Sequence, residues 1–252
     1  MASVIGAQLY TLREFTQTPG DIAQTLKKVG EIGYEAVQVS GFGPIDKKEL
    51  RTILDGEGLR CAATHVPFET MRDDFGRVVD EHKILGCEYP AIGGMPSEYR
   101  NPDGFHRFAR DATDVAARFK EHGMTFGYHN HSWELERSGD QTVLGLLMEG
   151  CGPEVTFEID TYWVQHGGGC PASWIRRASG RIPLLHLKDM AILDGQQVMA
   201  EIGEGNLDWA GILDAARSAG VVWYLVEQDV CQRDPFESLA ISLRNLRAMG
   251  LE

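Results

Sequence analysis

The chain has 252 residues, of which 43% are hydrophobic, so it is long enough to bury one sizeable core. Its formal net charge of −13 argues against a nucleic-acid partner, because phosphate backbones are bound by basic surfaces. No stretch comes near the roughly 20 apolar residues of a membrane helix and no signal-peptide pattern is present, so we expect a cytoplasmic protein without a membrane partner.

A short pattern recurs along the chain: an amphipathic helix, a glycine, and then a compact β-branched or aromatic run. Glycine suits the left-handed position after a helix, and five glycines are expected to end helices there. These are Gly33, Gly58, Gly86, Gly123 and Gly220. The runs predict eight strands, at residues 4–10, 35–39, 60–64, 88–92, 124–128, 155–159, 183–187 and 222–226.

Two helices have strong signals of their own. Asn101 and Pro102 predict a helix start, and apolar residues follow at three- and four-residue steps as far as Gly123. Asp234 and Glu237, on either side of a proline, predict the start of a C-terminal helix. Five cysteines without a C-x-x-C pair indicate neither a disulfide framework nor a structural zinc site.

Eight strands that alternate with helices match a closed parallel (β/α)₈ barrel, as a single domain over residues 1–252. A doubly wound open sheet is the alternative. No G-x-G-x-x-G motif opens a helix after the first strand, which counts against that alternative.

Polar residues end nearly every predicted strand, and several form pairs two positions apart, which the alternation of a strand sends to one face. They are Gln8, Gln38, His65, His129, His131, Glu158, Asp160, His186, Lys188, Glu227 and Asp229. In a barrel these strand ends meet around one site. Buried carboxylates and imidazoles usually pair or bind a metal, so we favour a metal site over a plain hydrogen-bond network. His82, on the apolar face of its helix, is instead expected to be a core residue.

Seven motifs follow one another from the first predicted strand to the last: GAQLYTLR, THVPF, YHNHSWEL, EIDTYWV, LLHLKDM, GEGNLDW and VEQD. Together they resemble the sugar isomerase and epimerase family with the xylose-isomerase-like TIM barrel. Ketose 3-epimerases, inosose dehydratase and endonuclease IV belong to that superfamily. The resemblance implies a divalent metal, with Mn²⁺ as first choice and Mg²⁺, Co²⁺ or Zn²⁺ as alternatives.

The resemblance also implies which residues hold the metal. Three of them match directly: Asp160, His186 and Glu227. The first ligand departs from the pattern, because the epimerases end the fifth strand with Glu-Asn where this chain has His129-Asn130. By likeness to inosose dehydratase, Glu134 is the first candidate. Glu136, which would face the same way on an extended segment, is the second, and His129 is the third. Three carboxylates and one imidazole favour Mn²⁺ or Mg²⁺.

Such an ion would acidify the C–H between a ketone and a hydroxyl and would stabilise the resulting enediolate. We therefore expect a metal-dependent isomerase or epimerase with a small carbohydrate substrate. Glu227 is the expected proton carrier on one face, with His129 or His131 on the other. The groups expected to orient substrate oxygens are Lys188, His65 and Glu158.

Three alternatives remain open. A lyase or dehydratase of a keto-sugar or keto-inositol would use the same enolate, and the histidine at position 129 gives it weight because a symmetric epimerase is simplest with two carboxylates. Phosphodiester hydrolysis in the manner of endonuclease IV needs a metal cluster and a basic surface. A non-catalytic sugar-binding barrel would need no metal. The sequence leaves a homo-oligomer open as well.

Overall fold

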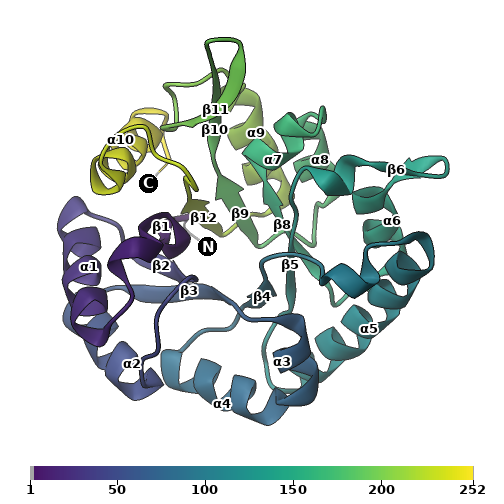
Figure 1. Ribbon diagram of the computed structural model, residues 1–252, viewed down its shortest axis with the longest axis horizontal. Helices are drawn as coiled ribbons and strands as arrows, with labels where there is room; N and C mark the ends of the chain where they lie inside the picture. Colours follow the sequence, from purple (N-terminus) through teal and green to yellow (C-terminus); the bar gives the residue numbers. More distant parts are fainter. Residues whose placement is uncertain (1–2, 252) are drawn as a thin grey trace.

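The protein is a closed barrel of eight parallel strands surrounded by helices. A computed structural model describes residues 3–251. Figure 1 looks down on the barrel, and the strands follow one another around it as β1-β12-β9-β8-β5-β4-β3-β2. The predicted (β/α)₈ barrel is confirmed, and the open-sheet alternative is wrong.

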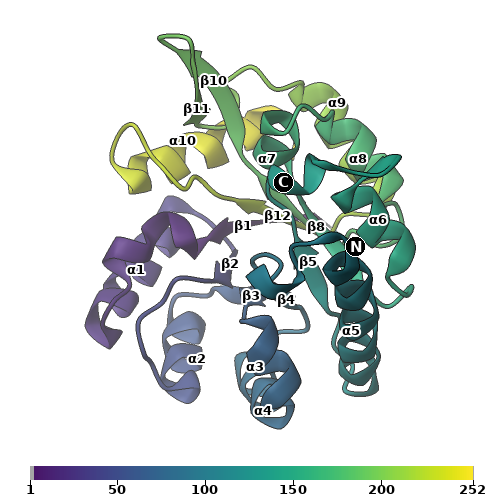
Figure 2. The same cartoon turned by 45° about the vertical axis from the view of Figure 1, so that its right-hand side comes forward.

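Each predicted strand overlaps one strand of the barrel. The bounds are β1 Val4–Gln8, β2 Ala36–Val39, β3 Arg60–His65, β4 Pro90–Ile92, β5 Gly127–His129, β8 Thr156–Asp160, β9 Leu184–Leu187 and β12 Trp223–Val226. Two hairpins lie outside the barrel: β6 Arg137–Ser138 with β7 Gln141–Thr142, and β10 Asp189–Leu193 with β11 Gln196–Ala200. Figures 1 and 2 both show the β10–β11 hairpin projecting from the body of the protein.

The helices form the outer layer of the barrel. They are α1 Pro19–Ile32, α2 Lys47–Gly56, α3 Phe68–Asp73, α4 Phe75–Leu85, α5 Pro102–Glu121, α6 Val143–Gly150, α7 Thr161–His166, α8 Pro171–Arg177, α9 Trp209–Ala219 and α10 Pro235–Ala248. Short 3₁₀ helices span Leu9–Phe15, Ser97–Tyr99 and Trp133–Leu135. Within residues 3–251, no helix has both the length and the apolar character needed to cross a membrane.

The predicted helix signals are confirmed. The Asn101 side chain accepts a hydrogen bond from the Gly104 N–H at the start of α5, and Asp234 accepts two at the start of α10. All five predicted stop glycines have a positive φ, between 64° and 105°. These caps satisfy backbone groups that a helix end otherwise leaves without partners.

Strand alternation divides the inside of the barrel into an apolar floor and a polar mouth. Ala36, Leu184 and Leu225 belong to one buried apolar cluster. The residue two positions further along each of their strands points to the same side and is polar. These polar residues are Gln38, His186 and Glu227, all buried.

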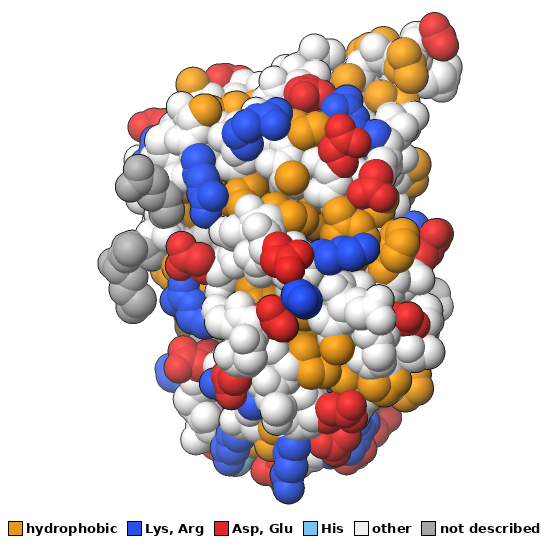
Figure 3. All heavy atoms as spheres, turned by 90° about the vertical axis from the view of Figure 1, so that its left-hand side faces the viewer, with side chains coloured by type: hydrophobic (Ala, Val, Ile, Leu, Met, Phe, Trp, Pro, Cys, Tyr) orange, Lys and Arg blue, Asp and Glu red, His pale blue; other side chains and the backbone are white. Residues whose placement is uncertain are grey.

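Charges of both signs are mixed on the surface. Figure 3 shows one face, on which Lys and Arg side chains are interspersed with Asp and Glu side chains. That face carries no continuous basic patch.

Candidate functional site

Four titratable side chains from four strands converge at the C-terminal end of the barrel. Each offers one potential ligand atom, and these atoms all lie within 4.8 Å of one another. The residues are His129 from β5, Asp160 from β8, His186 from β9 and the residue after β12, Glu227. All four are buried, with at most 4% of their surface exposed. The sequence predicted that these side chains would come together, and they do.

A hydrogen-bond chain fixes the orientation of His186. Glu158 can only accept, so the Gln38 amide donates from Nε2 to Glu158 Oε1 over 2.9 Å. The amide oxygen of Gln38 therefore faces His186 Nε2 at 2.7 Å and accepts its proton. This leaves Nδ1 of a neutral His186 with a free lone pair, directed into the cluster.

His129 is oriented in the same way. Its Nδ1 lies 3.3 Å from the Gly93 carbonyl, which can only accept a hydrogen bond. In the neutral imidazole, Nε2 then presents a lone pair to Asp160 Oδ2 at 3.2 Å. His186 Nδ1 likewise faces Glu227 Oε2 at 2.9 Å. Lone pairs that face carboxylate oxygens repel one another unless a proton or cation lies between them.

The hydrogen-bond inventory of residues 3–251 agrees with this geometry. His186 Nδ1 and Glu227 Oε2 are both buried and lie 2.9 Å apart, and neither makes a directed hydrogen bond there, although the Lys188 ammonium lies 2.8 Å from Glu227 Oε2. Orphaned buried polar atoms are rare in folded proteins, and a missing ion is one of their ordinary explanations. Two imidazole nitrogens and two carboxylates also form a donor set that suits a divalent transition metal. The residues present therefore fit a bound metal ion.

The charges in the cluster shift its pKa values strongly. Burial alone would raise the pKa of Glu227, but the Lys188 ammonium and the His186 imidazole hold it well below the usual range. For His186, burial lowers the pKa, yet Glu158 and Glu227 together raise it well above the ordinary value. Without a metal ion, the surplus of carboxylates would thus be offset by a proton on His186.

Lys188 is the cation of the site. It is 1% exposed, and its Nζ lies 3.0 Å from Asp160 Oδ2, 2.8 Å from Glu227 Oε2 and 2.7 Å from Asp229 Oδ2. Burial lowers the pKa of Lys188, but the three carboxylates raise it above the ordinary value, so the side chain is charged.

His65 and Glu158 lie beside the four-residue cluster. His65 Nε2 donates to Glu158 Oε2 over 2.8 Å, and His65, Glu158 and His186 form a second group of close ligand atoms. Since Glu158 already accepts from His65 and Gln38, it serves as a support that orients His186. The strand-end alternation indicated Gln38 as a residue of the site, but it could not predict this role.

Glu134 lies outside the group of four ligand atoms. Its Oε1 accepts from the Tyr128 hydroxyl over 2.7 Å and its Oε2 accepts from the His131 N–H over 2.8 Å. The chain is not extended here, as assumed for Glu136, but turns through the 3₁₀ helix Trp133–Leu135. Glu136 is therefore exposed, and the expectation that it faces the same way as Glu134 is wrong. His129, the third candidate, is the one that the structure places in the cluster.

His131 lies between the cluster and solvent. Its Nδ1 is buried without a partner among the described residues, and burial together with the nearby His129 lowers the pKa of His131 to about 3. The imidazole is therefore neutral near pH 7. Gly94 leaves room for it, because a Cβ there would lie 3.2 Å from His131 Cε1.

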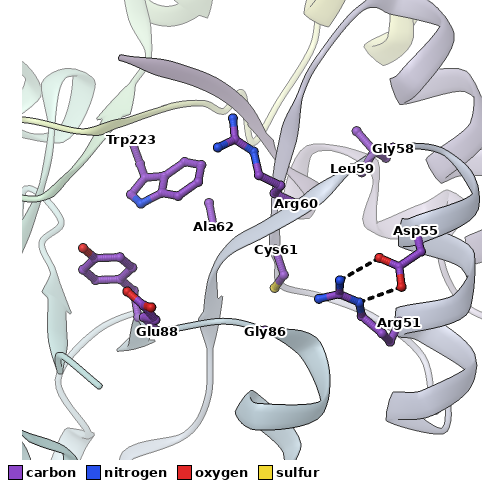
Figure 4. Close-up of a pocket in the computed structure, with 11 residues that line it drawn as sticks. Arg51, Asp55, Gly58, Leu59, Arg60, Cys61, Ala62, Gly86, Glu88 and Trp223 are labelled. Carbon is purple, nitrogen blue, oxygen red and sulfur yellow. Dashed lines mark hydrogen bonds and ion pairs between the residues drawn. The ribbon is translucent and has the colours of Figure 1, made fainter. Parts of the chain in front are cut away.

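Two cavities lie at opposite ends of the barrel. One, of about 420 Å³, is lined by His65, His131 and Arg100 and opens beside the cluster. The other, of about 500 Å³, lies where Arg60 begins β3 and Trp223 begins β12 (Figure 4). In (β/α)₈ barrels the chemistry occurs at the C-terminal ends of the strands, so the smaller cavity is the candidate substrate site.

Comparison with known proteins agrees with this arrangement. The family described as xylose isomerase-like TIM barrel matches residues 26–249. The chain belongs to this family.

Several known proteins are similar to the chain along most of its length. The rhizopine catabolism protein MocC of Rhizobium meliloti is 24% identical, over 91% of this chain and 82% of that protein. Inosose dehydratase of Geobacillus kaustophilus is 24% identical, over 66% of this chain and 61% of the enzyme. A sugar phosphate isomerase/epimerase from Parabacteroides distasonis is 25% identical with a TM-score of 0.81, covering 98% of this chain and 95% of that one. L-ribulose 3-epimerase, at 18% identity over 99% and 94% of the two chains, has a TM-score of 0.75.

Proposed function

We propose that this protein is a divalent-metal-dependent isomerase or epimerase that acts on a keto-sugar or a sugar derivative through an enediolate. The observation that carries the proposal is the set of four buried ligand atoms, among which His186 Nδ1 and Glu227 Oε2 have no hydrogen-bond partner within residues 3–251. The structural likeness to sugar isomerases and epimerases supports the same reading.

The metal would be held by Asp160, His186 and Glu227, with His129 as the fourth ligand. Glu134 is the alternative fourth ligand, but it would have to give up its bonds to Tyr128 and His131. When bound, a divalent ion supplies the positive charge that makes the C–H beside a carbonyl acidic and stabilises the enediolate. A donor set with two imidazoles is compatible with Mn²⁺, Co²⁺ or Zn²⁺ and suits Mg²⁺ less well.

The other polar residues would move protons and orient the substrate. Glu227, a carboxylate at the cluster, is the proposed base on one face of the substrate. His131 is neutral, lines the cavity and is free to accept or return a proton on the other face. The Lys188 ammonium stabilises negative charge that develops on a substrate oxygen, and His65, held by Glu158, orients a hydroxyl.

A lyase or dehydratase is the second candidate. It is favoured by His129, an imidazole where the epimerases have a carboxylate: with Glu134 as the fourth ligand, His129 would be free of the metal and could protonate a departing hydroxyl. The relationship to inosose dehydratase supports it as well. Phosphodiester hydrolysis is less well supported, since the face in Figure 3 mixes charges of both signs and Glu158 in the second group already accepts two hydrogen bonds.

Product analysis tests the proposal and separates the two candidates. The metal-stripped protein is reconstituted with Mn²⁺ and incubated with ketoses, 3-keto-glycosides and keto-inositols, and products are identified by NMR and mass spectrometry. An isomerase or epimerase conserves the mass of the substrate, whereas a dehydratase releases water and leaves an enone. Exclusive loss of water would establish the second candidate, and full turnover in metal-free protein would overturn the metal-dependent mechanism.

A further inference from the structure

Lys188 shares its carboxylate partners with the proposed metal ion. Its Nζ lies within 3.0 Å of oxygens of both Asp160 and Glu227, which belong to the group of four ligand atoms. Lys188 is 1% exposed, and its backbone is anchored because its N–H and C=O are both bonded to Thr161 Oγ1, at 2.9 and 2.8 Å. The Lys188 ammonium is therefore held beside the carboxylates of Asp160 and Glu227, the proposed metal ligands.

The three contacts of this ammonium differ in kind. Only the contact with Asp229 Oδ2, at 2.7 Å, has hydrogen-bond geometry within residues 3–251. The contact with Glu227 Oε2 is shorter than 3 Å, yet that oxygen has no hydrogen-bond partner in the described part of the chain. The approach to Asp160 is likewise an ion pair without a directed bond. The directed bond thus ties Lys188 to the one carboxylate outside the ligand group.

We propose that Lys188 is a tethered internal cation that competes with the divalent ion for Asp160 and Glu227, and that Asp229 is the positioning residue that allows both cations to share the site. The inference rests on the metal-dependent function proposed above. It assigns a role in metal affinity to Asp229, the last residue of the VEQD motif, for which the resemblance implies no role of its own.

Charge counting supports this division of roles. Asp160, Glu227 and Asp229 together carry three negative charges, and a divalent ion with the Lys188 ammonium carries three positive ones. If Asp229 were neutral, two carboxylates would face three positive charges in a water-poor interior. Repulsion between the Lys188 ammonium and the divalent ion is strong there, because the effective dielectric constant is well below that of water. Asp229 therefore weakens the competition by drawing the ammonium aside.

A double-mutant cycle on metal affinity tests the inference without using activity. Mn²⁺ binding to the metal-stripped protein is measured by isothermal titration calorimetry for the wild type, Lys188→Met, Asp229→Asn and the double variant. We expect Lys188→Met to bind Mn²⁺ at least about tenfold more tightly, because one competing charge is gone. Asp229→Asn should bind about tenfold more weakly, while in the Lys188→Met background the same change should cost less than about threefold.

Two outcomes contradict the inference. One is unchanged or weaker Mn²⁺ binding by Lys188→Met. The other is an equal loss from Asp229→Asn in both backgrounds, which would mean that Asp229 acts only through its own charge. Lys120→Met, which removes an exposed lysine paired with Glu154, is the matched control for net charge and should leave the affinity unchanged.

A loss of metal binding has to be distinguished from misfolding of a variant. Circular dichroism shows whether each variant folds, and Lys188→Gln replaces Lys188→Met if the apolar side chain is not accepted. If no variant and no wild-type protein binds Mn²⁺, both the inference and the metal-dependent function fail. If the wild type binds Mn²⁺ and the cycle is additive, the inference alone fails.

Discussion

His129 stands in the ligand cluster at the place where the resemblance implied a carboxylate. Its Nδ1 is directed to the Gly93 carbonyl, so its other nitrogen points to Asp160. Glu134 comes from the same segment, but it lies in the 3₁₀ helix Trp133–Leu135, and its side chain accepts a hydrogen bond from the His131 N–H. One turn of backbone thus decides which of the two side chains reaches the ligand cluster.

Substitution of each candidate distinguishes them. We expect His129→Asn to weaken Mn²⁺ binding by about tenfold or more, because loss of one ligand costs roughly that much or more. Glu134→Gln should leave Mn²⁺ affinity nearly unchanged but destabilise the fold by about 1–3 kcal/mol, since its amide group would face the Tyr128 or His131 donor. The two quantities are measured by calorimetric titration and urea unfolding, with exposed Glu136→Gln as the control. A larger loss of affinity in Glu134→Gln would return the ligand role to Glu134.

His82 shows what a buried histidine without a metal looks like. Its Nδ1 donates to the Val78 carbonyl and its Nε2 accepts from the Thr64 hydroxyl, both over 2.7 Å. Both ring nitrogens of His82 have a hydrogen-bond partner, whereas Nδ1 of His186 has none among the described residues. The expectation from sequence that His82 is a core residue is confirmed, at 2% exposure.

His82 should make the fold sensitive to acid. Burial lowers the pKa of His82 below the ordinary value of about 6.5, so the unfolded chain binds a proton that the folded chain refuses. This contribution to stability is fully present above about pH 6.5 and declines as the pH falls below it. His82→Gln should therefore have a smaller slope of unfolding free energy between pH 6.5 and 5, by up to about 1.4 kcal/mol per pH unit, measured by urea unfolding. An unchanged slope would mean that His82 is protonated in the folded state.

At the scale of elements, Asp189 joins β10, the turn that follows β11 and α9. Its Oδ2 accepts from the N–H groups of Gly203 and Gly205, at 2.8 and 3.1 Å, and from Trp209 Nε1 at 2.6 Å, while Oδ1 accepts from the Leu207 N–H at 3.2 Å. Glycine is required at 205, because a Cβ there would lie 2.3 Å from Asp189 Oδ1. Gly205 thus serves the close approach of the Asp189 carboxylate, whereas Gly203 supplies a positive φ of 85°.

Asp189→Asn should destabilise the protein by about 3 kcal/mol, because an amide has one acceptor oxygen and directs its NH₂ at groups that also donate. Asp208→Ala, which removes only the N-cap of α9, should cost about 1 kcal/mol. Urea unfolding with coincident fluorescence and circular dichroism transitions measures both. Equal losses would show that Asp189 does not organise the turn.

The sequence was sufficient for the elements whose signals are local. Glycine stops, caps such as Asn101, and alternating apolar runs predicted the barrel strands and the convergence of Asp160, His186 and Glu227. The β10–β11 hairpin was not among the predicted strands, although Asp194 and Gly195 turn it with positive φ. The position of the Glu134 side chain beside the His131 N–H depends on tertiary hydrogen bonds, which hydrophobic periodicity in the sequence cannot predict.

In the molecule as a whole, the apolar residues that stabilise the barrel and the polar residues of the candidate site occupy different levels of its interior. Its apolar floor, with Leu184 and Leu225, closes the interior, and the polar residues of the same strands meet above it. The cavity at the opposite end has the charged pair Arg51 and Asp55, with 42% and 56% of their side chains exposed, so solvent screens their interaction. The C-terminal end combines a cavity with the cluster of buried carboxylates and imidazoles.

Deuterium exchange in heavy water tests whether the protein removes a proton beside a carbonyl with the help of a metal ion. This step is common to both candidate reactions. NMR follows the C–H signal of ketoses and keto-inositols with Mn²⁺-loaded protein, metal-stripped protein, Asp160→Asn, and Arg60→Ala in the opposite cavity as the control. We expect exchange with the loaded wild type and with Arg60→Ala, and background rates with stripped protein and Asp160→Asn. Exchange at the full rate without metal, or no exchange with any of these substrates, would contradict this expectation.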